Sequence, residues 1–216
     1  MVLVFDLDDT LYDELSFVFS GFRAVAAWGQ STYGWDADDS YATMRKLLRE
    51  HGRGRIFDSW LAGRGSVRQA VNVYRHHTPR IALWPAAKAT LAAVRHMPCY
   101  IVSDGHKIVQ ASKVAALDLK ERFRGVYLTN RYGRARAKPS PYCFDLIRSR
   151  ERCGWSDMIY VGDNPAKDFV GLNPLGVVTV RVLTGQHRSV AATEGHEAGH
   201  RIRSLAALPR LIKAWS

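Results

Sequence analysis

The sequence predicts an α/β fold in which a parallel β-sheet is covered by helices on both faces. Short apolar runs that end in acidic or small polar residues recur along the chain, and helical patterns alternate with them. Strands and helices that alternate in this way are typical of parallel sheets with crossover connections. A second observation is a long stretch of helical periodicity after the first apolar run. That stretch predicts a small all-helical domain inserted into the α/β fold.

Apolar runs mark the candidate strands. The first run, residues 2–5, is followed at once by the acidic segment Asp6-Leu7-Asp8-Asp9. Unbroken apolar runs indicate strands that are buried on both faces of a parallel sheet. The later candidates are residues 99–102, 158–161 and 177–182, with a weaker one at 126–129. Apolar spacings of three and four predict helices over residues 86–96, 107–117, 141–152 and 204–215.

The inserted segment has helical periodicity and no strand pattern. Leu15, Val18, Phe22 and Val25 follow one another at spacings of three and four. The pattern repeats around residues 41–48, 57–61 and 67–74, with glycines between, which predicts four short helices. We therefore expect an α/β core domain of residues 1–13 and 79–216 and a helical cap domain of residues 14–78.

The composition is that of a globular protein: 216 residues with 47% hydrophobic content. No apolar run approaches the roughly 18 residues that span a bilayer, and the N-terminus has no signal-peptide pattern. We expect a cytoplasmic protein without membrane contact. The three cysteines are an odd number without CxxC spacing, so reduced thiols are expected.

The chain is strongly basic, with 31 Lys and Arg against 20 Asp and Glu and a net charge of +11. The basic residues are spread along the sequence rather than gathered in one arm. This distribution favours a small anionic substrate, or solubility alone, over nucleic-acid binding. The sequence gives no indication of the oligomeric state.

Acidic residues follow two of the predicted strands. Residues two apart in an extended strand point the same way, so Asp6 and Asp8 should face one side where the strand ends. Deprotonating two carboxylates that close together requires a cation between them. Asp163 ends another predicted strand, with Asp168 five residues further on. Carboxylates are the hard oxygen ligands that suit Mg²⁺. These residues therefore predict a magnesium site.

An anion site is predicted beside the acids. Ser103-Asp104-Gly105 ends the second major apolar run and opens a helix, where a hydroxyl and free backbone N–H groups can bind an anion. Taken alone, this segment fits Ser103 as a helix cap equally well. Lys138 supplies a cation just before another predicted helix, and the prolines around it stiffen its loop.

The acidic segment after the first strand, Ser103, Lys138 and the second acidic segment follow one another along the chain. In this order they resemble the four motifs of the haloacid dehalogenase (HAD) superfamily. The resemblance extends from residue 2 to about residue 185, and its spacing fits a member with a helical cap inserted after the first motif. It implies a Rossmann-like core and hydrolase activity. The segments that carry it are Asp6-Leu7-Asp8-Asp9-Thr10, Ser103, Lys138-Pro139, and Gly162-Asp163-Asn164 through Asp168.

The resemblance implies a Mg²⁺-dependent phosphohydrolase that works in two steps. Asp6 would attack phosphorus and become an aspartyl phosphate; Asp8 would protonate the leaving alcohol and then activate water. Family members that remove halide lack an acid at the position of Asp8, so phosphate chemistry is expected. A free Asp has a pKa near 3.9, so the acid role requires the site to raise the pKa of Asp8. Neighbouring acids raise the pKa of Asp8, and the metal lowers it.

The resemblance also implies the supporting residues. Ser103, Asp104 and Lys138 would bind the phosphoryl oxygens. Asp6, the backbone carbonyl of Asp8, and Asp163 would hold Mg²⁺. The remaining motif residues would support the metal shell, Lys138 or the catalytic loop: Asn164, Asp168 and Thr10.

The substrate is expected to be a small phosphorylated metabolite, such as a sugar phosphate or a nucleoside monophosphate. In this family the cap shapes specificity, and a phosphosugar mutase or a non-enzymatic binding protein on this fold are the alternatives. Candidate cap residues for substrate contact, each of which packing or solvent exposure explains as well, are Arg23, Trp28, Arg45, Lys46 and Trp60.

Two other metal-binding plans fit the sequence poorly. His196-Glu197-Ala198-Gly199-His200 matches the HExxH pattern of zinc enzymes, but Gly199 disfavours the required helix. After His200 the sequence has no Asp, Glu or His that could act as a third ligand. A response-regulator receiver domain would have its Lys-Pro after the last strand, whereas two predicted strands follow Lys138.

Overall fold

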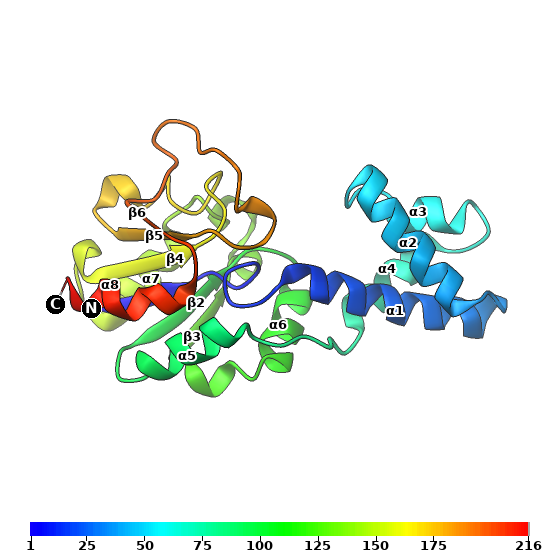
Figure 1. Cartoon of the computed structure of the whole chain (residues 1–216), viewed down its shortest axis with the longest axis horizontal. Coiled ribbons are helices and arrows are strands. Elements are labelled where there is room, and N and C mark those ends of the chain that lie inside the picture. The colour runs from blue at the N-terminus through cyan, green and yellow to red at the C-terminus, as the bar shows by residue number, and fades with distance from the viewer. Residues whose placement is uncertain (216) are drawn as a thin grey trace. The chain divides into compact units, whose positions relative to one another are not determined.

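A computed structural model describes residues 1–215, which contain a six-stranded parallel sheet flanked by helices (Figure 1). The strand order is β3-β2-β1-β4-β5-β6, and each neighbouring pair is parallel. The strands are β1 (Val2–Phe5), β2 (Cys99–Ser103), β3 (Gly125–Leu128), β4 (Met158–Gly162), β5 (Val178–Val182) and β6 (His200–Ile202). This sheet confirms the predicted α/β, Rossmann-like fold.

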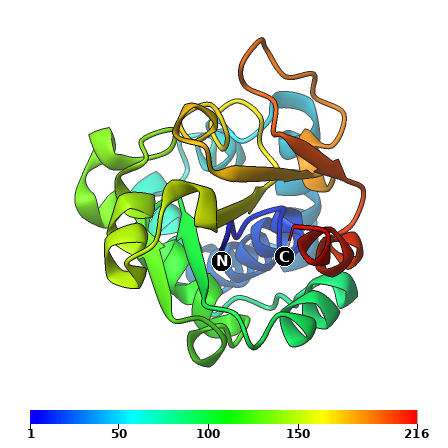
Figure 2. The same ribbon diagram turned by 90° about the vertical axis from the view of Figure 1, so that its left-hand side faces the viewer.

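Helices cover both faces of the sheet. Figure 2 shows α7 on one side and α5 and α8 on the other. Pro85 opens α5 at a first-turn position, as expected for a residue without a backbone N–H. The C-terminal helix predicted over residues 204–215 is instead a 3₁₀ turn, Leu205–Ala207, followed by α8. The core helices are α5 (Pro85–Ala93), α6 (Lys107–Ala116), α7 (Tyr142–Glu151) and α8 (Leu208–Lys213).

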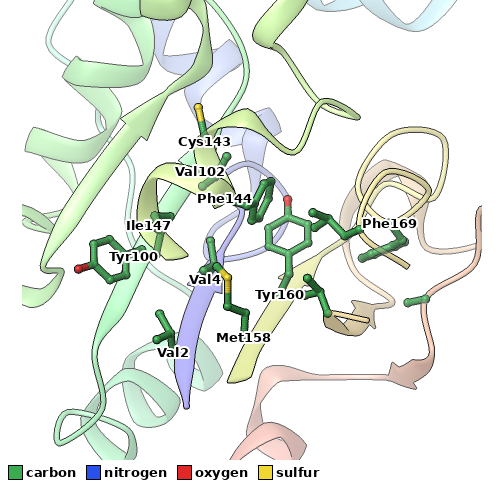
Figure 3. Packing of buried hydrophobic residues seen from close by; sticks show 13 residues of the cluster. Val2, Val4, Tyr100, Val102, Cys143, Phe144, Ile147, Met158, Tyr160 and Phe169 are labelled. Atoms are coloured by element: carbon green, nitrogen blue, oxygen red, sulfur yellow. The ribbon is translucent and has the colours of Figure 1, made fainter. Parts of the chain in front are cut away.

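The main core lies between the central strands and α7 (Figure 3). Val4, Val102 and Tyr160 come from three neighbouring strands and are fully buried. Phe144 of α7 packs edge-to-face on Tyr160, with ring centroids 4.8 Å apart. This packing fixes the ring of Tyr160, whose hydroxyl reaches the site described below.

The segment between β1 and α5 forms a compact helical unit of residues 15–81, separate from the unit of residues 1–14 and 82–216. It contains α1 (Glu14–Tyr33), α2 (Ala37–His51), α3 (Ile56–Leu61) and α4 (Val67–His76). The first helix has 20 residues, so it is longer than the short helix expected. Val18, Phe22 and Val25 of α1 are buried in the unit's own core. The division into domains at residues 14 and 78 stays a prediction.

Within residues 1–215, no helix combines the length and the apolar character needed to cross a bilayer.

Candidate active site

The predicted acidic and anion-binding segments meet at one edge of the sheet. β1 is the central strand, paired with β2 on one side and β4 on the other. Because parallel strands present their carboxyl ends at the same edge, the loops after these three strands lie together. Asp6 follows β1, Ser103 ends β2 and Asp163 follows β4. The backbone N–H of Asp6 donates to the carbonyl of Val161, 2.8 Å away, which ties two of these loops together.

Lys138 is buried between two carboxylates. Its Nζ lies 2.6 Å from Oδ1 of Asp6 and 2.7 Å from Oδ1 of Asp168, and the hydroxyl of Tyr160 is 3.0 Å away. Burial acts to lower the pKa of Lys138, but Asp168 and Asp6 outweigh it and hold that pKa well above its ordinary value. The lysine is therefore a fixed cation beside Asp6.

Asp6, Asp163 and Asp168 form a buried acidic cluster in which one carboxylate oxygen of each lies within 4.8 Å of the others. Burial, reinforced by Asp6 and Asp168, raises the pKa of Asp163 to about 9. Burial also raises the pKa of Asp6 to about 7, although Lys138 opposes it. Ionising all the carboxylates of such a crowded cluster is unfavourable without a further cation. Their oxygens are ligands of the kind that a hard divalent ion prefers.

Asp168 supports Lys138 rather than offering a free ligand. Its Oδ1 accepts hydrogen bonds from Lys138 Nζ and the hydroxyl of Tyr160. Its Oδ2 accepts one from the backbone N–H of Asn164 at 2.9 Å. A Cβ on Gly162 would lie 2.5 Å from Oδ2 of Asp168, so glycine is required at this close approach. The side chain of Asn164 accepts the N–H of Ala166 at 2.9 Å and shapes its own turn. Asp6 and Asp163 are the carboxylates of this cluster that could hold a metal, beside the backbone carbonyl expected of Asp8.

The carboxylate of Asp8 is bound by a different set of donors. Lys113 Nζ lies 2.7 Å from Oδ1, the hydroxyl of Tyr12 donates to Oδ1 at 2.5 Å, and Gln110 Nε2 donates to Oδ2 at 2.8 Å. Burial acts to raise the pKa of Asp8, but Lys113 and the other donors outweigh it and lower that pKa. These donors thus favour the anionic form of Asp8, whereas its expected role as an acid requires a raised pKa.

At the end of β2, the hydroxyl of Ser103 and the carboxylate of Asp104 have different surroundings. Ser103 is buried, and its Oγ accepts the amide of Gln110 at 2.6 Å. The carboxylate of Asp104 accepts the hydroxyl of Thr129 at 2.7 Å and lies 3.2 Å from Lys167 Nζ. A carboxylate repels phosphate, so residue 104 can help bind an anion through its backbone N–H but not through its side chain.

The loop after β1 is braced through Asp9, which the sequence reasoning did not single out. Its backbone is in the left-handed region, with φ of 54°. Its carboxylate accepts the N–H of Glu14 at 3.0 Å and of Gln186 at 3.1 Å, and its carbonyl accepts the hydroxyl of Thr184 at 2.5 Å. The buried hydroxyl of Thr10 has no hydrogen-bond partner among residues 1–215. The hydroxyl of Thr10 therefore makes no hydrogen bond to the described residues that would support its expected role in bracing the loop.

Sequence reasoning also missed Gln110 and Lys113, which contact Asp8. The two residues lie three apart on α6, so they share a face of the helix. That face is buried, and Val114 beside them is buried as well. Polar residues on the buried side of a predicted helix are the signal that could have found them.

The HExxH segment lacks the geometry of a zinc site. His196 lies in a turn and His200 opens β6, so the two histidines are not on one face of a helix. Glu197 instead forms an ion pair with the buried Arg181 of β5, with 2.9 Å between Nη1 and Oε2. The segment serves the packing of the sheet edge.

Comparisons with known proteins agree with this fold. A family model described as haloacid dehalogenase-like hydrolase matches residues 1–176. The chain is 27% identical to a glyceraldehyde 3-phosphate phosphatase of Methanocaldococcus jannaschii, over 98% of this chain and 96% of that protein. A 2-haloacid dehalogenase structure from Pseudomonas syringae is similar with a TM-score of 0.69 and 20% identity, over all of both chains. A magnesium-bound HAD-type hydrolase from Bacillus subtilis has a TM-score of 0.70 and 16% identity, over 98% and 97% of the chains.

Proposed function

The chain belongs to the haloacid dehalogenase-like hydrolase family, and from this premise we propose that it is a magnesium-dependent phosphatase with Asp6 as its nucleophile. The observation that supports this most directly is the surroundings of Asp6, which follows the central strand. Its carboxylate has Lys138 on one oxygen at 2.6 Å and shares a buried acidic cluster with Asp163. A nucleophile for phosphorus, a fixed cation and a metal ligand are thereby combined in one place.

In the proposed reaction, an oxygen of Asp6 attacks phosphorus and the bond between phosphorus and the ester oxygen breaks. Lys138 and the hydroxyl of Ser103 neutralise and orient the phosphoryl oxygens, which carry most of the charge in such transfers. The aspartyl phosphate is then hydrolysed by water. Covalent catalysis of this kind divides one difficult displacement into two easier ones.

Asp8 distinguishes a phosphatase from a dehalogenase. In the first step it gives a proton to the leaving alcohol, and in the second it removes a proton from the attacking water. Lys113, Tyr12 and Gln110 hold it as a carboxylate, which suits the second step directly. For the first step this carboxylate must take up a proton from solvent, which then passes to the leaving oxygen. A halide leaving group needs no proton, so an acid here favours ester hydrolysis.

The acidic residues supply the metal site. Asp6 and Asp163 would hold Mg²⁺, since Asp168 is already engaged by Lys138. When bound, the ion adds positive charge that offsets the carboxylates and the phosphate. The raised pKa values of Asp6 and Asp163 support this assignment, because they show that the metal-free protein disfavours the anionic form of both carboxylates.

The substrate is proposed to be a small phosphorylated sugar. The relatives named glyceraldehyde 3-phosphate phosphatase, from M. jannaschii and Methanopyrus kandleri, are 27% and 28% identical and cover 98% and 87% of this chain. Their names make triose phosphates the first substrates to test, ahead of larger sugar phosphates and nucleoside monophosphates.

The test is phosphate release from a panel of esters by wild type and Asp6→Asn. The panel contains glyceraldehyde 3-phosphate, hexose phosphates, nucleoside monophosphates and p-nitrophenyl phosphate, each with and without Mg²⁺. We expect Mg²⁺-dependent turnover by wild type and a loss of at least about 10³-fold in kcat for the variant. Acid quenching during turnover should trap a phosphoryl group on the peptide that contains Asp6. Equal activity in Asp6→Asn, or a phosphoryl group on another residue, would refute the assignment.

A further inference from the structure

Building on the proposed phosphatase function, we propose that Gln110 is a positioning residue that sets two catalytic side chains at once. It turns the hydroxyl of Ser103 toward the phosphoryl group and, together with Lys113, fixes the orientation of Asp8. One amide nitrogen contacts both partners: Nε2 is 2.6 Å from Ser103 Oγ and 2.8 Å from Asp8 Oδ2. A single side chain therefore links the phosphate anchor to the acid–base residue.

The chemistry of the partners settles which way the amide of Gln110 faces. The carboxylate of Asp8 can only accept, so the NH₂ end of Gln110 must be turned to it. The same nitrogen lies within hydrogen-bonding distance of Ser103, and its second N–H is available for that contact. Gln110 is therefore a donor to both residues.

This arrangement determines what the hydroxyl of Ser103 can do. Since its oxygen already accepts from Gln110, its proton must be directed elsewhere. Among residues 1–215, the other hydrogen-bond contact of Ser103 Oγ is the carbonyl of Asp104 at 3.4 Å, which is long for an O–H donor. The proton is thus free to turn to a phosphoryl oxygen. The amide of Gln110 keeps Ser103 as a donor.

Lys113 completes the support of Asp8 from the same face of α6. Its side chain is 3% exposed, with Nζ 2.7 Å from Asp8 Oδ1 and 3.7 Å from Glu14 Oε1. Gln110 holds the other oxygen of Asp8. Contacts to both oxygens fix the plane of the carboxylate, not merely its position. Proton transfer to a leaving oxygen depends on that plane.

The experiment compares two leaving groups. p-Nitrophenolate leaves without a proton, whereas the alkoxide of glyceraldehyde 3-phosphate requires one from Asp8. kcat and KM are measured with Mg²⁺ for both esters, in wild type, Gln110→Met, Gln110→Glu and the control Ser112→Ala. Ser112 lies on the same helix, but its hydroxyl donates to the carbonyl of Val109.

For Gln110→Met we expect kcat on the alkyl ester to fall about 10- to 100-fold more than kcat on p-nitrophenyl phosphate. KM for both esters should rise, because the hydroxyl of Ser103 is no longer directed. Gln110→Glu should raise KM further, since the new carboxylate accepts the proton of Ser103 and repels Asp8. Ser112→Ala should leave the ratio of the two kcat values at that of wild type.

An equal loss on both esters, or no loss, in folded Gln110→Met and Gln110→Glu would overturn the positioning role. Circular dichroism identifies a variant that fails to fold, and Lys113→Met and Lys113→Arg then test the same arrangement. Lys113→Met should shift the leaving-group ratio and Lys113→Arg should largely restore it. A wild type inactive on every ester would refute the proposed function as well, whereas an active wild type with an unchanged ratio in the variants refutes this inference alone.

Discussion

Nζ of Lys138 lies 2.7 Å from Oδ1 of Asp168, and both side chains are almost completely withdrawn from solvent, at 1% and 0% exposure. Removing one member of such a pair is destabilising, because the other member loses a buried charged partner. Lys138 keeps Asp6 as its other carboxylate partner, so removal of Asp168 should leave one lysine facing one acid. Asp6, the proposed nucleophile, would then be held more tightly by Lys138.

Asp168→Asn should therefore lower the free energy of unfolding by about 3 kcal/mol and reduce kcat. Urea unfolding monitored by circular dichroism measures the first effect. Asp145→Asn is the matched control: Asp145 forms an ion pair of similar length, 2.8 Å, with Arg148, but its side chain is 51% exposed. An exposed pair of this kind contributes about 1 kcal/mol or less. Similar losses in the two variants would contradict the argument.

Magnesium should stabilise the protein more at high pH than at low pH. The pKa values of Asp6 and Asp163, about 7 and about 9, lie above the ordinary 3.8, so the folded metal-free protein holds protons that the unfolded chain has released. These two groups therefore make it less stable as pH rises from about 4 to about 9. A divalent ion replaces the protons, so its benefit grows over the same range.

Thermal melts at about pH 6 and about pH 8.5, with Mg²⁺ or with EDTA, measure this difference. The increase in Tm on adding Mg²⁺ should be larger at the higher pH. Asp163→Asn removes one ligand and one titrating group, so the increase should shrink, most of all at the higher pH. A larger increase at the lower pH in wild type would show that these carboxylates are not the ligands.

The sequence predicts the sheet best where strands are buried on both faces. β1 spans the predicted residues 2–5, and each of its residues is at most 3% exposed, so the apolar run coincides with the strand. β6 was missed because it has three residues and His200 and Arg201 are exposed. The length of α1 was underestimated, since the predicted apolar spacing ends at Val25 whereas the helix continues to Tyr33.

The site is predictable where it follows from strand order. Asp6 and Asp163 follow neighbouring parallel strands, so their meeting is a consequence of topology. The contact between Lys113 and Asp8 is different. The two are 105 residues apart, and their pairing depends on how α6 packs beside the catalytic loop. No local pattern in the sequence predicts that contact. The donors around Asp8 could therefore be identified only from the structure.

Gly162→Ala should impair the site without changing any side chain that is proposed to take part in catalysis. The added Cβ would lie 2.5 Å from Oδ2 of Asp168, so this carboxylate must move away from Lys138. We expect kcat to fall at least about tenfold and stability by about 1–3 kcal/mol, as for other overpacked positions. Gly199→Ala is the control, because its Cβ would meet its nearest neighbours at an ordinary 3.7 Å. Wild-type kinetics in Gly162→Ala would show that the position of Asp168 tolerates displacement.

Arg181 should control the loop that braces Asp9. It is a buried residue on β5, and its guanidinium binds Glu197 at 2.9 Å and the carbonyls of His187 and Val190 at 2.7 Å each. Arg181→Met removes the guanidinium donor from both carbonyls, and that of His187 keeps the N–H of Val190 at 3.1 Å. The loss of these contacts favours opening of the loop. The amide of Gln186, which donates to Asp9, should then exchange with solvent faster, and kcat should fall.

Hydrogen exchange of residues 184–199 measures the opening directly. The control is Arg201→Met, because Arg201 is the register partner of Arg181 on β6 but is exposed. Its loss removes a positive charge from the same sheet edge and leaves the loop contacts in place. We expect faster exchange in Arg181→Met alone. Equal protection in both variants would mean that the loop is held by Thr184 and Gln186 at Asp9, independently of the buried arginine.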